Sequence, residues 1–149
     1  MLVLEPFQPD GSLPPGVHPA EWAEIETRFG WTPHRQDLMR GFREGALLLK
    51  AAGCKAIILD GSFVTAKEVP GDFDACWSVN DVDPDKVDPI FFDFSNFRAA
   101  QKARFQGEFF PAEIPEGLSG KTFLEFFQID KESGEPKGVV ALDLEAWKP

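Results

Sequence analysis

The chain has 149 residues, of which 43% are hydrophobic and 15 are phenylalanine, so it has the length and apolar content for one core. We predict a single domain over residues 1–149. The formal net charge of −10 disfavours binding to duplex DNA or long RNA, which needs many lysine and arginine contacts to phosphates. A nucleoside triphosphate or a short RNA end is compatible with this charge, and a protein acceptor or a basic partner protein suits it better.

The sequence also bears on location. It contains no apolar run long enough to cross a membrane, and its first residues lack the basic segment and apolar core of a secretory signal. Cys54 and Cys76 both lie in apolar, strand-like runs, which favours buried thiols over a disulfide or a metal site. We therefore expect a cytoplasmic protein that does not contact membranes.

The first third of the chain predicts an irregular segment followed by two helices. Residues 1–18 are rich in proline and glycine, which favours an extended lead-in. Pro19 suits the first turn of a helix that ends at Gly30. A longer helix is predicted over residues 33–51, because Thr32 can cap its start and a proline follows directly.

Two strands are predicted next. The first covers residues 54–60 and is nearly all apolar, as expected for a strand that is covered on both faces. A short helical turn or loop over residues 62–70 leads to a second strand over residues 72–78. Asp72 and Asp74 are two apart on this second strand, so their side chains are expected to share one face of the sheet.

The polar residues of this region are of the types that bind a metal nucleotide. Two carboxylates on one rigid edge suit Mg²⁺ or Mn²⁺, which take oxygen ligands and commonly hold substrate phosphates as well. Gly61 allows backbone to approach a phosphate closely, and Ser62 offers an N–H and a hydroxyl to it. The alternative interpretation is structural: Gly-Ser as a simple turn and Asp-Phe-Asp as a solvated strand edge in an ordinary α/β protein.

Basic residues are candidates for holding the phosphates. A helix is predicted from Asp88 to Phe105, although residues 89–92 also fit a short strand. Arg98 and Lys102 are four residues apart, so they lie on one face of this helix and can grip phosphates if that face adjoins the aspartates; a solvated amphipathic helix is the alternative.

The C-terminal part predicts an antiparallel hairpin over residues 121–144. Its strands are expected at residues 121–129 and 137–144, and the polar, glycine-containing residues 131–136 form the turn between them.

The segment over residues 54–77 resembles the nucleotidyltransferases of the DNA polymerase β superfamily. Their signature is a hydrophobic residue, Gly-Ser, about ten residues and then Asp-hydrophobic-Asp. Here Asp60 separates the hydrophobic residue from Gly61. The wider pattern Gly-Ser-Phe-Val-Thr-x-Lys-x-x-Pro-Gly-Asp-x-Asp is similar to a family of small bacterial nucleotidyltransferase-like proteins without established function. The resemblance implies an α+β fold, the minimal nucleotidyltransferase fold, with a mixed β-sheet and helices packed mainly on one face.

The resemblance also implies an activity and its cofactor. It suggests a Mg²⁺- or Mn²⁺-dependent enzyme that moves NMP from an NTP to a macromolecular hydroxyl, on a protein side chain or an RNA 3′ end. Small members of the superfamily often act in bacterial toxin–antitoxin or phage-defence pairs. The alternative is a catalytically silent module of the same fold, an antitoxin or regulatory subunit that binds a partner protein. Lys67, on the connection between the two strands, is a further candidate for neutralising phosphate charge, with an exposed surface lysine as its alternative role.

The superfamily normally adds a third carboxylate on a later strand. We predict Glu125 for this role, because it lies within an otherwise apolar predicted strand, where a charge is costly unless it is paired or bound to metal. Asp143, near the end of the last predicted strand, is the second choice. Asp93 is a third candidate, although it is expected on a helix.

Overall fold

The computed structural model describes residues 4–149, which form four α-helices and one five-stranded mixed sheet. The helices are α1 (Trp22–Phe29), α2 (Pro33–Ala51), α3 (Ser95–Phe105) and α4 (Phe123–Phe127). The strands are β1 (Gly16–Ala20), β2 (Ala56–Asp60), β3 (Phe73–Trp77), β4 (Gly107–Pro111) and β5 (Gly138–Asp143). Short 3₁₀ segments occur at Ser62–Val64, Pro84–Lys86 and Pro89–Phe92. The α+β class and the mixed sheet expected from the sequence are confirmed.

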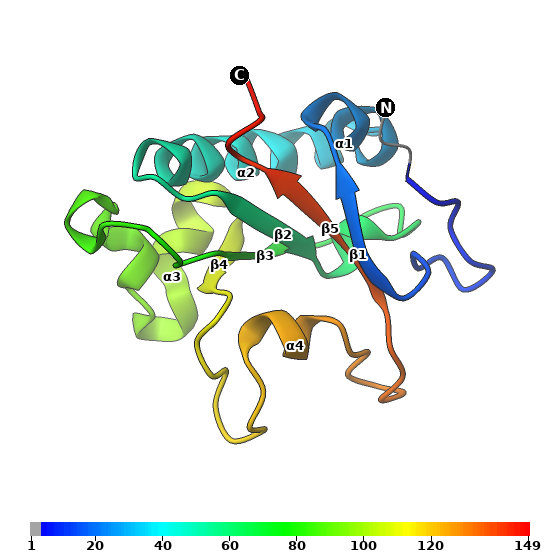
Figure 1. The fold of residues 1–149 in the computed structure, drawn as a ribbon. Helices are drawn as coiled ribbons and strands as arrows, with labels where there is room; N and C mark the ends of the chain where they lie inside the picture. Colours follow the sequence, from blue (N-terminus) through cyan, green and yellow to red (C-terminus); the bar gives the residue numbers. More distant parts are fainter. Residues whose placement is uncertain (1–3) are drawn as a thin grey trace.

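The order of the strands in the sheet is β1-β5-β2-β3-β4 (Figure 1). β2 pairs antiparallel with both β5 and β3, whereas the outer pairs β1–β5 and β3–β4 are parallel. The last strand of the chain therefore lies inside the sheet, between β1 and β2.

The two faces of the sheet are covered differently. α1 and α2 lie across one face, and α4 lies on the other (Figure 1). Side chains of β3 alternate between these faces: Phe73, Ala75 and Trp77 join the large core beneath α1 and α2, while Cys76 joins a smaller apolar cluster with Phe127 of α4. The face that α4 covers only in part is the one on which the polar site forms.

α2 begins as the sequence predicts. The hydroxyl of Thr32 accepts a hydrogen bond from the backbone N–H of Arg35 at 3.1 Å, and a proline occupies the first helical position. The apolar stripe predicted on this helix is buried in the core; its members are Leu38, Met39, Phe42, Ala46 and Leu49.

Gly41 of α2 lets α3 approach the helix closely. A Cβ atom at this position would overlap the carbonyl group of Phe105, at the end of α3. We therefore expect Gly41→Ala to lower the free energy of unfolding by about 2 kcal/mol, even though alanine favours helix by about 1 kcal/mol. Urea denaturation checks this, with Gly71→Ala as the control, because a Cβ at Gly71 would meet nothing within 4 Å. Equal stability of Gly41→Ala and the wild type would contradict this account of the helix contact.

The C-terminal hairpin predicted over residues 121–144 is wrong. Residues 121–129 contain helix α4, whose start is fixed by a capping box between Thr122 and Glu125. The apolar run around Glu125 is too short for periodicity to distinguish strand from helix, and the capping signal decides it. The second predicted strand is present as β5, but its partners are β1 and β2.

Two further expectations need correction. The lead-in predicted for residues 1–18 is irregular from residue 4 to residue 15, but β1 then begins at Gly16 and includes Pro19; residues 1–3 lie outside the described part. The helix predicted over residues 88–105 is divided into the 3₁₀ segment and α3, because residues 96–98 have positive φ angles of 50–62°. Residues 89–92 are therefore not a strand.

Candidate functional site

Three acidic side chains from neighbouring strands form a row across the sheet. Asp74 of β3 is paired in register with Asp60 of β2 on one side and with Glu108 of β4 on the other. Residues at paired positions point to the same face of a sheet. Asp74 is two residues before Cys76, so this row lies on the face that α4 covers.

Asp72 completes the acidic cluster. One carboxylate oxygen each from Asp72, Asp74 and Glu108 lie within 4.8 Å of one another. Oxygen donors at this separation suit a hard divalent cation such as Mg²⁺ or Mn²⁺. The structure thus brings together the two aspartates that the sequence singles out, and it adds Glu108 to them.

Burial and clustering raise the pKa values of Asp74 and Asp72. The pKa of Asp74 rises to about 7, mainly because burial disfavours the charged form and also because Asp72, Glu108 and Asp60 are negatively charged neighbours. The pKa of Asp72 is also raised, first by burial and then by Glu108. A bound cation would stabilise the ionised form of these carboxylates.

Two cations predicted as phosphate ligands lie beside this cluster. Glu108 accepts an ion pair on each of its oxygens: Arg98 Nε is 3.1 Å from Oε2, and Lys102 Nζ is 2.9 Å from Oε1. Arg98 is the last of the three residues with positive φ, a conformation that is costly for non-glycine residues and is often found at functional sites. The structure thus places Arg98 and Lys102 on Glu108, which adjoins the aspartates, and their role with phosphates stays a prediction.

The Gly61-Ser62 turn lies directly beside Asp74. Gly61 has φ of 83°, and a Cβ atom there would be 3.0 Å from Asp74 Oδ2. Glycine is therefore required both by the backbone and by the close approach of the carboxylate. Ser62 begins the following 3₁₀ turn, whose last hydrogen bond runs from Thr65 N–H to Ser62 O at 3.2 Å.

Arg35 binds the backbone of the segment that follows this turn. Its side chain is fully buried, and its guanidinium donates to the carbonyl oxygens of Phe29, Phe63, Thr65 and Lys67 at 2.6–3.1 Å. The cation also lies over the ring of Trp31, 3.7 Å from its centroid. Burial lowers the pKa of Arg35 to about 10, so it remains charged at neutral pH.

The first turn of α2 therefore organises the connection between β2 and β3. Besides the bonds of Arg35, the ring of His34 contacts the carbonyl oxygen of Pro70 at 2.5 Å. The sequence places both residues in the first turn of a helix but does not show which segment they hold, because that depends on tertiary packing.

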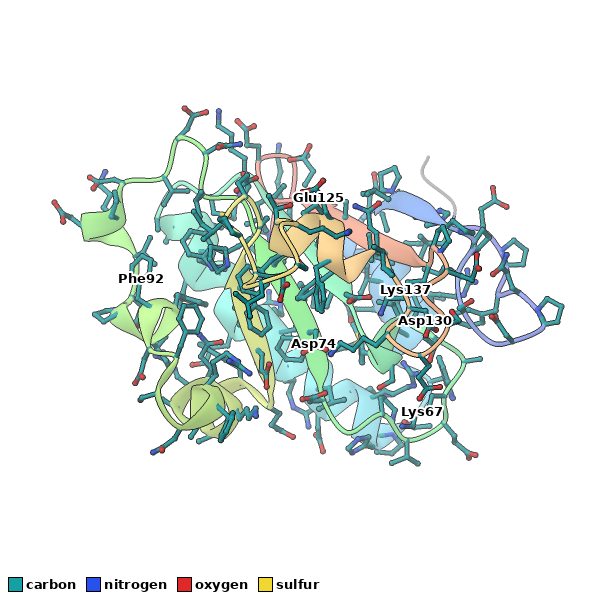
Figure 2. The ribbon with its side chains drawn as sticks, turned by 90° about the horizontal axis from the view of Figure 1, so that it is seen from below. Lys67, Asp74, Phe92, Glu125, Asp130 and Lys137 are labelled. Atoms are coloured by element: carbon teal, nitrogen blue, oxygen red, sulfur yellow. The ribbon has the colours of Figure 1, made fainter. Side chains whose placement is uncertain are left out.

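A cavity of about 460 Å³ opens beside the turn. Its polar lining includes Asp60, Asp74 and Ser62 together with Lys131 and Lys137 from the segment that follows α4. Figure 2 shows Asp74, Lys137 and Asp130 on this side of the molecule, whereas Phe92 lies toward the opposite end. The two lysines were not among the residues that the sequence motif identifies.

Glu125 is not part of the cluster. It is exposed on α4, where its carboxylate accepts a hydrogen bond from Thr122 N–H at 3.0 Å (Figure 2). The two alternatives also bind nearby backbone: Asp143 accepts from Glu145 N–H at 2.9 Å, and Asp93 accepts from Ser95 N–H at 3.1 Å. The later-strand carboxylate that lies with Asp72 and Asp74 is Glu108 of β4, not Glu125.

A signal for Glu108 exists in the sequence. Like Glu125, it is a single acidic residue among apolar ones, directly before two phenylalanines, and it is buried in the structure. Asp60 carries a similar signal, as the acidic end of an apolar strand. Neither could be selected without the order of the strands, which decides which acids become neighbours.

Lys67 lies at the edge of the site. Its side chain is exposed and its backbone carbonyl is the part that Arg35 binds. Its charge lowers the pKa of Asp72, but it is the smallest of the effects on that group and Lys67 does not line the cavity.

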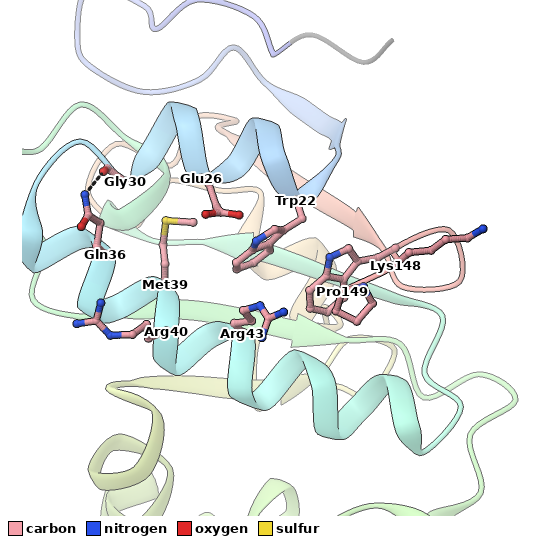
Figure 3. Close-up of a pocket in the computed structure, with 10 residues that line it drawn as sticks. Trp22, Glu26, Gly30, Gln36, Met39, Arg40, Arg43, Lys148 and Pro149 are labelled. Atoms are coloured by element: carbon pink, nitrogen blue, oxygen red, sulfur yellow. Dashed lines mark hydrogen bonds between the residues drawn. The ribbon is translucent and has the colours of Figure 1, made fainter.

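A second cleft lies between α1, α2 and the C-terminal residues (Figure 3). Its volume is about 490 Å³, and its walls come from α1, α2 and the C-terminal residues, including Trp22, Met39, Arg43 and Trp147. The acidic row is on the opposite face of the sheet, so the larger cleft is separate from the carboxylates.

The fold and site define an α+β protein whose mixed sheet carries a row of carboxylates beside a glycine-serine turn. The chain belongs to a family of unknown function, DUF6932, whose model matches residues 5–143. No curated protein and no solved structure matches the chain. Within residues 4–149, no helix has both the length and the apolar character that crossing a bilayer requires.

Proposed function

We propose that the chain is a Mg²⁺- or Mn²⁺-dependent nucleotidyltransferase with a nucleotidyltransferase fold. The observation that carries the proposal is the convergence of Asp72, Asp74 and Glu108 within 4.8 Å, beside the Gly61-Ser62 turn. The donor set fits a hard cation, because all three groups supply oxygen and two have raised pKa values that a cation would relieve. The substrates are an NTP and a macromolecular hydroxyl on a protein side chain or an RNA 3′ end.

In the proposed reaction, the acceptor hydroxyl oxygen attacks the α-phosphorus of the NTP. The bond from that phosphorus to the bridging oxygen of the β-phosphate breaks, and pyrophosphate leaves. A bound divalent cation supplies charge stabilisation to the phosphoryl group. Asp72 and Asp74 would hold that cation, the Gly61-Ser62 turn would position the phosphates, and Glu108 would accept the proton of the acceptor hydroxyl.

In this proposal, Arg98 and Lys102 bind Glu108 before the nucleotide arrives and its phosphates afterwards. They neutralise Glu108 in the structure, and the proposed role requires them to turn from this carboxylate toward ligand phosphates. Arginine and lysine bind phosphate with charge-assisted hydrogen bonds, so this exchange replaces one anionic partner by another.

The same two ion pairs favour one alternative function. Both oxygens of Glu108 are occupied by cations, as they would be in a module that has the fold but performs no transfer. Such a module would bind a partner protein, and its bulk negative charge favours a basic one.

Label transfer separates these two functions. The purified protein is incubated with each α-labelled NTP, Mg²⁺ or Mn²⁺ and bacterial lysate, beside Asp72→Ala/Asp74→Ala. We expect transfer of label to protein or RNA by the wild type only, and a loss of roughly 100-fold or more in Glu108→Gln, because metal-site groups are sensitive to such changes.

Glu125→Gln is the matched control for Glu108→Gln. It removes the same charge from an exposed position on α4, outside the carboxylate cluster, so transfer is expected to continue. Equal loss in both variants would contradict the assignment of Glu108. A folded wild-type protein that transfers no label under any condition would leave the binding module as the better function.

A further inference from the structure

We propose that the cavity beside the Gly61-Ser62 turn is a polyphosphate site whose cations are Lys137 and Lys131, and that buried Asp60 competes with the ligand for Lys137. This inference rests on the proposed function, because it names the residues that hold the phosphates of its nucleotide. It also gives Lys131 and Lys137 the phosphate-binding role that the sequence suggested for Lys67, which does not line the cavity.

Asp60 is the unusual group in this cavity. Only 4% of its surface is exposed, and Lys137 Nζ lies 3.1 Å from its Oδ1 as its ion-pair partner. Burial raises the pKa of Asp60, and Lys137 opposes that change. A buried carboxylate with one cationic partner is costly when that partner leaves, so Asp60 restrains Lys137 in the absence of ligand.

The backbone around the two lysines is well fixed. The N–H of Lys137 donates to Gln128 O at 2.8 Å, and Lys137 directly precedes β5. Asp130 accepts from the N–H groups of Glu132 and Ser133 at 2.8 and 3.1 Å, which orders the turn that carries Lys131. The lysines are thus placed at the cavity by hydrogen-bonded backbone.

Lys131 acts on the whole acidic group. Its positive charge lowers the pKa values of Asp60, Asp72 and Asp74 alike, so it lies close enough to influence all three. Its side chain is exposed and forms no ion pair within the described residues. Its Nζ lies 6.0 Å from the centroid of the Phe126 ring, so Lys131 can turn to a phosphate without breaking an ion pair.

The remaining cavity lining favours a metal-bound polyphosphate over a simple anion. Asp74, Asp130 and Glu132 also line the cavity, and they would repel a free anion. A divalent cation offsets that repulsion. A volume of about 460 Å³ accommodates a triphosphate-sized group.

Competition between Asp60 and the ligand has a specific signature in binding. Inorganic tripolyphosphate with Mg²⁺ is the probe, and isothermal titration calorimetry measures its affinity for four proteins: the wild type, Lys137→Met, Asp60→Asn and the double variant. We expect Lys137→Met to bind roughly 10-fold or more weakly, since a charge-assisted hydrogen bond is lost. We expect Asp60→Asn to bind about 5-fold more tightly, because Lys137 is released from a charged partner. The double variant should behave as Lys137→Met alone.

Two further variants complete the test. Lys131→Met should weaken binding, whereas Lys67→Met should stay within about 2-fold of the wild type, because Lys67 lies outside the cavity. Circular dichroism confirms that each variant is folded before affinity is measured. Unchanged affinity in Lys137→Met, or unchanged or weaker binding by Asp60→Asn, would overturn the inference, as would a wild type that binds no tripolyphosphate.

The binding test needs no turnover, so its failure differs from failure of the transferase. If tripolyphosphate binds with the expected pattern of variants but no label is transferred, the polyphosphate site stands and the transferase does not. If the wild type and Lys137→Met transfer label equally well, the transferase stands and the inference about Lys137 is wrong.

Discussion

Replacing Asp74 by asparagine is expected to stabilise the protein at pH 8 by about 2–4 kcal/mol when divalent cations are removed. The folded protein raises the pKa of Asp74 from 3.8 to about 7, so its ionised carboxylate is unfavourable in the folded state. The protonated group contributes stability that is fully present below pH 3.8 and is lost as the pH rises through about 7. Asparagine does not ionise, so Asp74→Asn avoids this loss of stability. Its advantage over the wild type should therefore disappear near pH 4.

Urea denaturation in EDTA at pH 4 and pH 8 measures this effect. Asp85→Asn is the control, since Asp85 is exposed in the 3₁₀ segment Pro84–Lys86, and its substitution should change stability by less than about 0.5 kcal/mol. Adding Mn²⁺ should remove most of this difference at pH 8. Saturation at 100 times the dissociation constant stabilises a binding protein by about 2.7 kcal/mol, and Asp74→Asn lacks a ligand for the ion. If Asp74→Asn is less stable than the wild type in EDTA at pH 8, the proposed electrostatics are wrong.

Replacing Arg35 by methionine is expected to lower the free energy of unfolding by about 3–5 kcal/mol, the second large effect. Methionine has a similar length but leaves four carbonyl oxygens without the guanidinium: those of Phe29, Phe63, Thr65 and Lys67. Because three of these belong to the connection between β2 and β3, hydrogen exchange should increase most in residues 62–71.

Arg35→Lys and Arg40→Met are the comparisons for this variant. Lysine keeps the charge but not the planar arrangement of donors, so it should recover only part of the stability. Arg40 lies on the same helix, is exposed and pairs with Asp37, so its loss should change stability by less than about 1 kcal/mol. A loss of under 1 kcal/mol in Arg35→Met would show that the turn does not depend on this residue.

The sequence was most informative where local chemistry decides the structure. The start of α2 at Thr32-Pro33 follows from capping. The two-residue period of a strand predicts that Asp72 and Asp74 share one face; their carboxylates do lie close together, although Asp72 lies one residue before β3. The helix at Phe123–Phe127 was missed, although Thr122 and Glu125 carry the capping signal, because an apolar run also suits a strand.

The rest of the site depends on contacts between distant segments. Glu108 and Asp60 become neighbours of Asp74 only through the order of β2, β3 and β4, and hydrophobic patterning does not determine that order. Arg35 shows the same limit: its position in a helical first turn is readable, but the loop that it binds is about 30 residues further along the chain.

The internal position of β5 has a consequence for how the chain acquires its structure. β1 hydrogen-bonds to β5 across more than 100 residues, pairing Gly16 with Gly138, whereas β2 and β3 are close neighbours in sequence. Closing so large a loop carries an entropic cost before its contacts form, and pairings of this kind slow folding. During synthesis, the β2–β4 part of the sheet can therefore assemble before residues 138–143 emerge from the ribosome. The edge of β2 then stays open to other strands until β5 inserts, which makes this step the one most exposed to aggregation.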